Sequence, residues 1–269
     1  MENPDRDQTA RLVGVSPATL EIARGRLTDR GIDPSQVLGR DDFGGEITTA
    51  GFYVVLGSVA ATEKAGQSPT HALAKLALRA GLPSEVADTL YLAYNQQSAE
   101  EAGHGDKVFG NAYYAMGGFA YEGEQSVVGT GDPSSALLNS DDLKENRKRL
   151  GGAAGLLGGI ETVALQRAFP NIVGWCERWD HPIARDLISQ IRDTVRPEES
   201  RHVLIWRYVF HQMIASKGEK VIEFYRSATN NGRKLVAAED IDRETFERMI
   251  GTAAPTPRQL LGKDRVSVS

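Results

Sequence analysis

Apolar residues recur along most of this chain at the three- and four-residue spacing of an amphipathic α-helix. In one such stripe, Phe52, Leu56 and Val59 are followed by Glu63, which places a carboxylate on the buried side of a helix. Four long helices are predicted in this way, over about residues 46–65, 84–116, 140–169 and 183–216. The pattern therefore predicts an all-α fold, a four-helix bundle with accessory helices.

Ser, Pro and Gly predict where the shorter elements begin and end. Ser16 and Pro17 are typical of a helix N-terminus, and Gly31 ends the helix that follows. Residues 33–45 are predicted to form a loop that contains at most one short turn. A short helix over residues 69–80 is predicted to connect the first two long helices.

Three features predict irregular geometry inside the long helices. Gly103 and Gly105 flank His104, which indicates either a close approach by another backbone or a substrate, or a local distortion of the helix. Pro197 lacks an N–H donor, so a kink or break is expected just before it. Pro170 is expected to end the third long helix.

These elements predict a single domain over residues 1–269. A loop with Gly-containing breaks and no helical periodicity interrupts it, and such a loop fits either a lid or disorder. The expected parts are an N-terminal covering segment at 1–45, the bundle at 46–216 with the loop at 117–139, accessory helices at 217–251 and a flexible tail at 252–269.

Composition narrows the classes of function. Charged residues make up 25% of the chain and hydrophobic residues 41%, which is ordinary for a soluble protein. The net charge of −5 and the lack of a Lys/Arg run argue against nucleic acid as a partner. The single Cys176 excludes an intrachain disulfide, a Cys-based zinc site and an attached rubredoxin-type iron centre. No signal peptide and no membrane-spanning apolar run is recognised, so a cytoplasmic protein without membrane contact is expected.

Two copies of the motif Glu-Glu-x-x-His lie 98 residues apart. On a helix, residues three apart share a face, so Glu101 projects with His104, and Glu199 projects with His202. A further Glu lies 38 residues before each motif, namely Glu63 and Glu161. Glu46 also begins an apolar run and competes with Glu63, but the 98-residue offset favours Glu63. Chance periodicity of exposed Glu residues is the alternative explanation.

This repeated set matches the ligand pattern of ferritin-like di-metal carboxylate bundles. Such bundles take one Glu from each of two helices and a Glu-x-x-His from each of the other two. Four carboxylates and two imidazoles nearly neutralise two divalent ions and surround them with hard oxygen donors. A dinuclear metal site is therefore predicted, with Glu63, Glu101, His104, Glu161, Glu199 and His202 as its ligands and catalytic centre.

Helical spacing also predicts which residues line this site. Tyr94 and Gln97 precede Glu101 by seven and four residues, so both are expected to face the metals. Arg192 lies one heptad before Glu199 and is expected to point inward, where it pairs with an acid or receives an anionic substrate.

The third long helix is predicted to provide part of a substrate wall. Gly158 and Ala154 lie three and seven residues before Glu161 and leave space on the metal-facing side. The space either admits substrate, with Gln97 as a further contact, or accommodates bulky neighbouring side chains. Substrate is expected to enter beside Gly158 and Ala154, under the 117–139 loop.

The residues around both motifs resemble a known superfamily. Residues 99–106 look like the first metal motif of soluble acyl-carrier-protein desaturases. Residues 198–202 are similar to the second motif of those desaturases and of bacterial multicomponent monooxygenases. Over roughly residues 46–216 the chain thus resembles the ferritin-like di-iron oxidase and oxygenase superfamily. Gly103 departs from the desaturase pattern, which usually has Arg at this position.

The resemblance implies two iron ions, dioxygen as co-substrate and electrons from a separate ferredoxin or reductase. It implies Glu101 and Glu199 as bridging ligands, with Glu198 and Arg201 as the acid and Arg that support them. The expected substrate is a small or carrier-bound organic molecule that is hydroxylated, desaturated or oxidised in a related way. A homodimer is compatible with this expectation.

Three other functions share parts of the pattern. A manganese catalase has a close ligand set and a similar size, with manganese in place of iron. A ferritin-like ferroxidase that stores iron is disfavoured by the long central loop. A scaffold that has lost its chemistry is disfavoured by six intact ligands.

Overall fold

The structure is a computed structural model that describes residues 17–41, 44–120 and 140–217. The described residues are mostly helical, which confirms the predicted all-α class. The accessory helices, the C-terminal tail and most of the predicted 117–139 loop lie outside the described residues. The α-helices within these described ranges are α2 (Pro17–Asp29), α3 (Thr49–Leu78), α4 (Ser84–Gly103), α5 (Gly110–Gly117), α7 (Leu143–Val163), α8 (Phe169–Glu177), α9 (Pro182–Gln190) and α10 (Arg196–Lys217).

Three π-helical segments join these helices without a turn between them. They are η2 (His104–Phe109) between α4 and α5, η4 (Ala164–Ala168) between α7 and α8, and η5 (Ile191–Val195) between α9 and α10. The distortion predicted around Gly103 and Gly105 is therefore present as η2. The irregularity predicted before Pro197 is present as η5, which ends two residues earlier.

The chain divides into two compact units. Unit 1 comprises residues 1–67, 100–131 and 167–196, and unit 2 comprises residues 68–99, 132–166 and 197–269. Helix α3 contributes its first part to unit 1 and its last part to unit 2, and α4 contributes most of its length to unit 2.

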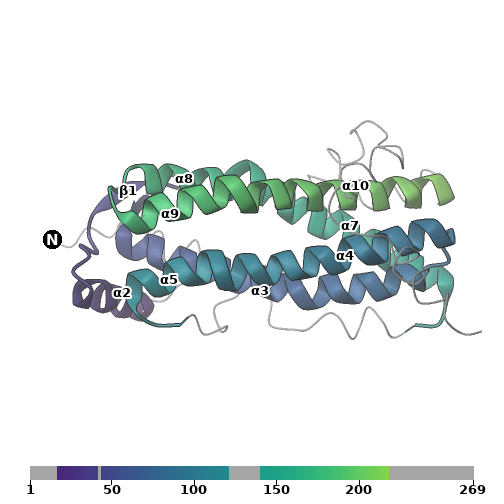
Figure 1. Ribbon diagram of the computed structural model, residues 1–269, viewed down its shortest axis with the longest axis horizontal. Helices are drawn as coiled ribbons and strands as arrows, with labels where there is room; N and C mark the ends of the chain where they lie inside the picture. Colours follow the sequence, from purple (N-terminus) through teal and green to yellow (C-terminus); the bar gives the residue numbers. More distant parts are fainter. Residues whose placement is uncertain (1–16, 42–43, 121–139, 218–269) are drawn as a thin grey trace, which may run out of the picture. The chain divides into compact units, whose positions relative to one another are not determined.

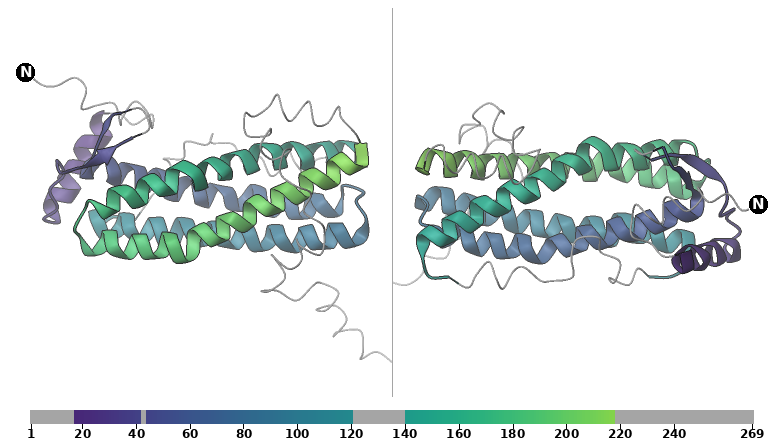
Figure 2. Two further views of the ribbon diagram at one scale, coloured as in Figure 1. Left: turned by 90° about the horizontal axis from the view of Figure 1, so that it is seen from above. Right: turned by 180° about the vertical axis from the view of Figure 1, so that it is seen from behind.

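Two strands in unit 1 pair in an antiparallel hairpin. Strand β1 (Val37–Arg40) lies within residues 33–45, so the loop prediction for that region is wrong. Strand β2 (Glu46–Thr48) occupies the predicted start of the first long helix, which begins at Thr49 instead. Tertiary contacts support the hairpin, because Trp175 Nε1 donates to the carbonyl oxygen of Arg40 at 3.1 Å. As Figure 1 and Figure 2 show, β1 lies beside α8 and α2 lies beside α5.

Aromatic side chains fill the core of unit 1. The Tyr53 and Tyr113 rings stack with centroids 4.1 Å apart, and Arg26 Nη1 donates to the Tyr113 hydroxyl at 3.1 Å. Phe52 packs edge-on against Trp175 and Trp179. These contacts join α2, α3, α5 and α8 into one core.

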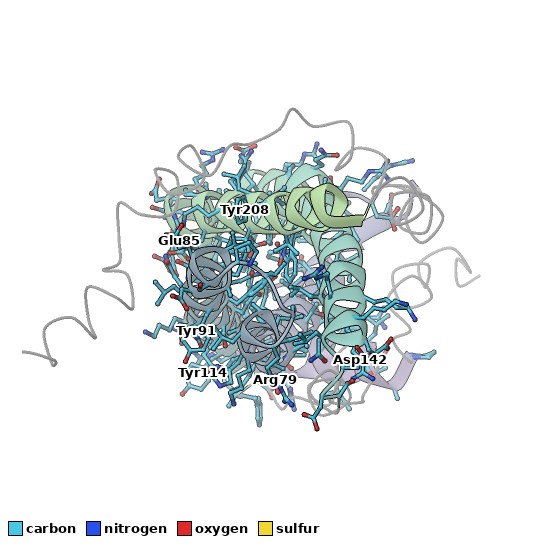
Figure 3. All side chains as sticks on the ribbon, turned by 90° about the vertical axis from the view of Figure 1, so that its right-hand side faces the viewer. Arg79, Glu85, Tyr91, Tyr114, Asp142 and Tyr208 are labelled. Atoms are coloured by element: carbon cyan, nitrogen blue, oxygen red, sulfur yellow. The ribbon has the colours of Figure 1, made fainter. Side chains whose placement is uncertain are left out.

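Four helical segments build the core of unit 2, and Figure 3 views them nearly end on. Its fully buried large side chains include Tyr94, Trp206 and Tyr208. The buried core residues come from the end of α3 (Leu73, Ala74, Leu76, Ala77), from Ala80, from α4 (Val86, Leu90, Ala93, Tyr94), from α7 (Leu150) and from α10 (Ile205, Trp206, Tyr208, Val209).

Buried polar contacts tie the start of α7 to the end of α3 in unit 2. The Nδ2 atom of Asn146 donates to the carbonyl oxygens of Arg79 at 3.0 Å and Ser140 at 3.1 Å. Arg147 Nε donates to the carbonyl oxygen of Ala80 at 3.1 Å. These donors satisfy carbonyl groups that a helix end leaves without intrahelical partners. Figure 3 labels Arg79 and Asp142 at this junction.

Two prolines, Pro69 and Pro170, do not interrupt the helices as the sequence predicted. Pro69 lies inside α3, which continues to Leu78, so no separate connecting helix forms there. The helix persists because Leu73 and Leu76 beyond the proline are fully buried, and their burial offsets a lost hydrogen bond. Pro170 does not end a helix either. It lies in the first turn of α8, which continues directly from η4, so the helical path passes through the proline.

Candidate metal centre

Unit 1 brings together one Glu and one Glu-x-x-His motif. Glu63 lies in α3, Glu101 lies in the last turn of α4, and His104 begins η2. One ligand atom from each of these three residues lies within 4.8 Å of the others. His104 Nδ1 is 3.2 Å from Glu63 Oε2. We call these three residues the unit 1 triad.

Two glycines permit the close packing of this triad. A Cβ atom on Gly66 would lie 3.3 Å from Glu101 Oε2. A Cβ atom on Gly105 would lie 2.9 Å from both the carbonyl oxygen of Ala60 and the amide nitrogen of Lys64. The backbone of α3 therefore passes directly against η2, which confirms the close backbone approach predicted around His104.

Unit 2 brings together the second Glu and the second Glu-x-x-His motif. Glu161 lies in α7, and Glu199 and His202 lie in α10. His202 Nδ1 is 3.5 Å from Glu199 Oε1, and a ligand atom of Glu161 lies within 4.8 Å of one on His202. These three residues form the unit 2 triad. Residues that are 98 positions apart in the sequence thus occupy the same role in each unit.

Neutral donors hold the carboxylate of Glu161. Gln97 Nε2 donates to Glu161 Oε1 at 2.6 Å, and Trp206 Nε1 donates to Glu161 Oε2 at 2.9 Å. The ring of Tyr94 packs on that of Trp206 with centroids 5.0 Å apart. Burial, followed by the charge of Glu161, raises the pKa of Tyr94 well above its ordinary value, so its hydroxyl stays protonated.

All six residues of the two triads are buried, with exposed fractions of 0–9%. Carboxylates and imidazoles are rarely buried without charge compensation, because removing an ion from water is costly. Four carboxylates carry a formal charge of −4 when ionised, and two divalent cations would balance it. Oxygen and imidazole nitrogen donors suit iron, manganese and zinc, and no sulfur donor belongs to either triad.

The structure separates the other predicted site residues into two groups. Tyr94 and Gln97 face Glu161, as the helical spacing predicted.

Arg192 does not point inward, so that prediction is wrong. It pairs with Glu177, and both side chains are about half exposed. Glu198 and Arg201 are partly buried in α10, with Arg201 Nη2 3.7 Å from Glu198 Oε1.

A helical distortion explains the outward orientation of Arg192. The residue lies inside η5, so a π-helical segment separates it from Glu199. A π-helical turn contains an extra residue, which rotates the preceding side chains by about 100° relative to a regular α-helix. Tyr94 keeps the predicted orientation because α4 is regular from Ser84 to Gly103.

The predicted substrate wall lies on α7. Gly158 is buried in α7, but the side chain of Ala154 lies outside the described residues. The amide of Gln97 hydrogen-bonds Glu161, which gives this residue a role in holding a candidate ligand. Glu46, the competing ligand candidate, is exposed at the start of β2 and lies outside the described groups of candidate metal ligands.

Sequence reasoning missed Trp206. A signal was present, because Trp206 follows Glu199 by seven residues and His202 by four. This spacing places all three residues on one face of α10. The same spacing rule that identified Gln97 and Tyr94 on α4 would have identified Trp206 on α10.

Among the described helices, none has an apolar stretch of the length needed to cross a membrane. No family model matches the chain, and no curated protein and no solved structure matches it.

Proposed function

We propose that the chain is an O2-dependent di-iron oxidoreductase that oxidises a small or carrier-bound organic substrate. The observation that carries this proposal is the duplicated triad. Each compact unit buries one Glu together with one Glu-x-x-His, and the two sets are related by the 98-residue offset. Chance placement of exposed Glu residues does not account for six buried ligands.

The donor set fits two divalent metal ions. Each triad would supply two carboxylates and one imidazole, a combination that binds iron or manganese. The proposal includes a ferritin-like four-helix bundle in which both triads serve one dinuclear centre. Four helical segments around the core of unit 2 support that architecture.

Iron held by such ligands supplies a centre that, once reduced, reacts with dioxygen. The residues of the chain bind and orient the metals and limit the access of water. Gln97 and Trp206 hold Glu161 in place through hydrogen bonds, and the ring of Tyr94 packs against the ring of Trp206. The apolar core of unit 2 includes Tyr94 and Trp206 and would exclude water from the metal held there.

The proposed reaction needs electrons from outside this chain. A single Cys cannot provide the four thiolates of an iron–sulfur cluster. Cys176 is also buried, and burial raises the pKa of its thiol to about 12, so it is not a reactive thiolate. A separate ferredoxin or reductase is the proposed donor.

Metal analysis and oxygen consumption test the proposal. Protein produced in iron-replete medium should contain about two iron ions per chain. The variant His104→Ala/His202→Ala should lose them, whereas His71→Ala should retain them, because His71 is exposed and contacts Asn95. Retention of both metals in the double variant would contradict the ligand assignment.

The reduced protein should consume oxygen in stopped-flow and electrode measurements. Disproportionation of peroxide by a manganese-loaded protein that does not react with oxygen would contradict the proposal and identify a manganese catalase instead. Progressive accumulation of ferric mineral would indicate iron storage.

A further inference from the structure

The two donors that hold Glu161 are replaced by valines at the equivalent positions of the other half of the repeat. Gln97, which donates to Glu161, corresponds by the 98-residue offset to Val195. Trp206, which also donates to Glu161, corresponds to Val108. Valine side chains carry no hydrogen-bonding group. The two lone Glu residues, Glu63 and Glu161, therefore have different partners at equivalent sequence positions.

The difference extends to the next layer of side chains. Tyr94 packs on Trp206 and is fully buried. Its counterpart, Arg192, is half exposed and pairs with Glu177. Val108 and Val195 also lie inside π-helical segments, whereas Gln97 and Trp206 lie in regular α-helices. The Gln97, Trp206 and Tyr94 group thus belongs to unit 2 alone, and we call it the Glu161 clamp.

We infer that the Glu161 clamp makes the two metal-binding halves unequal, with Gln97 and Trp206 acting as positioning residues for the metal held by the unit 2 triad. This inference rests on the proposed function. Each oxygen of Glu161 accepts a hydrogen bond from the clamp, and these two bonds restrain rotation of the carboxylate. A carboxylate has about four lone-pair sites, so it can also bind a metal ion.

Hydrogen bonds to a ligating carboxylate fix its orientation before the metal arrives. Loss of such outer partners typically weakens metal binding about 10- to 100-fold. Gln97 and Trp206 donate to Glu161, so removal of either donor should weaken the metal held by the unit 2 triad more than the other metal. The metal-free protein should already contain the clamp, because its bonds join protein groups alone.

Binding of Mn²⁺ to the metal-free protein tests this inference without any measurement of activity. Equilibrium dialysis, with free Mn²⁺ counted by electron paramagnetic resonance, should show two ions bound per wild-type chain. In Gln97→Leu, a near-isosteric change, one ion should bind as in wild type and the other about 10- to 100-fold more weakly. Trp206→Phe, which removes the other donor, should weaken the same ion.

Val195→Ile provides the matched control, because it changes packing at the equivalent position without altering a hydrogen bond. It should leave both Mn²⁺ affinities within about threefold of wild type. Unchanged binding in both Gln97→Leu and Trp206→Phe, or equal weakening of both ions, would overturn the inference. A wild-type chain that binds no metal would instead overturn the proposed function.

Indole N–H resonances provide a second readout in the metal-free protein. The chain has three Trp residues, so a sample with ¹⁵N-labelled Trp should show three such signals. Glu161→Gln should shift the Trp206 signal, while the Trp175 signal, whose N–H donates to Arg40, should stay in place. An unshifted Trp206 signal would show that the clamp is not formed before the metal binds and would overturn the inference.

Discussion

Gly105 lies so close to Ala60 that a Cβ atom on Gly105 would be 2.9 Å from the carbonyl oxygen of Ala60. Gly105 follows His104, and Ala60 lies three residues before Glu63, so this contact sets the distance between two residues of the unit 1 triad. His104 Nδ1 and Glu63 Oε2 are 3.2 Å apart as a result. A glycine that is costly to helix stability thus permits the approach of two candidate ligands.

Gly105→Ala should therefore damage the unit 1 triad. The new methyl group would meet backbone atoms of Ala60 and Lys64, which cannot move without shifting α3. We expect a loss of about 1–3 kcal/mol in the free energy of unfolding, together with weaker metal binding. Urea denaturation and metal analysis of the purified variant measure both effects.

Gly103→Ala is the matched control for that substitution. Gly103 has helical dihedral angles, and nothing lies within 4 Å of its Cβ position. Alanine there should raise the free energy of unfolding by roughly 0.5–1 kcal/mol, because glycine is unfavourable in a helix. Equal effects of the two substitutions would show that the contact with Ala60 is unimportant.

Metal removal should destabilise the whole protein. Without cations, each triad buries two carboxylates with no metal charge to balance them, and a ligand that binds only the folded state adds stability. At a free Mn²⁺ concentration 100-fold above its dissociation constant, one ion should add about 2.7 kcal/mol. Urea denaturation with Mn²⁺ and with a chelator measures the difference.

The same comparison in His104→Ala/His202→Ala separates specific from nonspecific effects of the cation. This variant should show little stabilisation by Mn²⁺, whereas His71→Ala should respond like the wild type. A wild-type protein that gains no stability from Mn²⁺, Fe²⁺ or Co²⁺ would contradict a metal-binding role for the triads.

Cys176 should be unreactive in the folded protein. Burial, with a smaller contribution from the charge of Glu177, raises the pKa of its thiol to about 12. The thiol is therefore protonated at pH 8 and shielded from reagents. Ellman's reagent should detect no thiol in native protein and one per chain in urea, and none in Cys176→Ala under either condition. Rapid labelling of native protein would contradict the buried position.

The free energy of unfolding should fall at alkaline pH, because burial raises the pKa values of two side chains in the folded state. The pKa values of Cys176 and Tyr53 are both raised in the folded state, chiefly by burial. A raised pKa means that the unfolded chain loses its protons first, so the free energy of unfolding is highest below about pH 9. It should decrease as the pH rises from 9 towards 12. Denaturation midpoints across this range test the sign, and Cys176→Ala should reduce the slope.

Asn146→Asp should destabilise unit 2. The Asn146 amide donates to two backbone carbonyl oxygens, and a carboxylate in its place would face them as a third acceptor. Loss of two buried hydrogen bonds, with repulsion in addition, should cost at least about 2 kcal/mol. Asn95→Asp is the control, because Asn95 is less buried and its amide donates to a single carbonyl, that of Tyr91. A similar loss of stability in both variants would contradict a special role for Asn146.

The sequence predicted features that depend on local geometry. Residues three apart share a face of any helix, so the pairing of Glu101 with His104 and of Glu199 with His202 followed from spacing alone. Tyr94 and Gln97 were placed correctly because α4 is regular over their positions. The all-α class followed from apolar periodicity for the same reason.

Features that depend on distant contacts could not be predicted in this way. The β-hairpin at residues 37–48 is stabilised by Trp175 in α8 and by Arg178 directly after it, more than a hundred residues away. Helix α3 continues through Pro69 because buried side chains on both sides of the proline favour the helix. Propensity rules describe the isolated chain, and tertiary packing outweighed them at both places.

The two Glu-x-x-His motifs, their partner Glu residues and the 98-residue repeat that links them are all visible in the amino-acid sequence. The tertiary structure was needed to show that Gln97 and Trp206 hold Glu161, and that Arg192 is half exposed and pairs with Glu177. These orientations depend on the angle at which each side chain leaves the helix axis. Spacing fixes orientation within a regular helix, but an extra residue in a π-helical turn rotates the side chains before it. Packing between helices determines where such turns form.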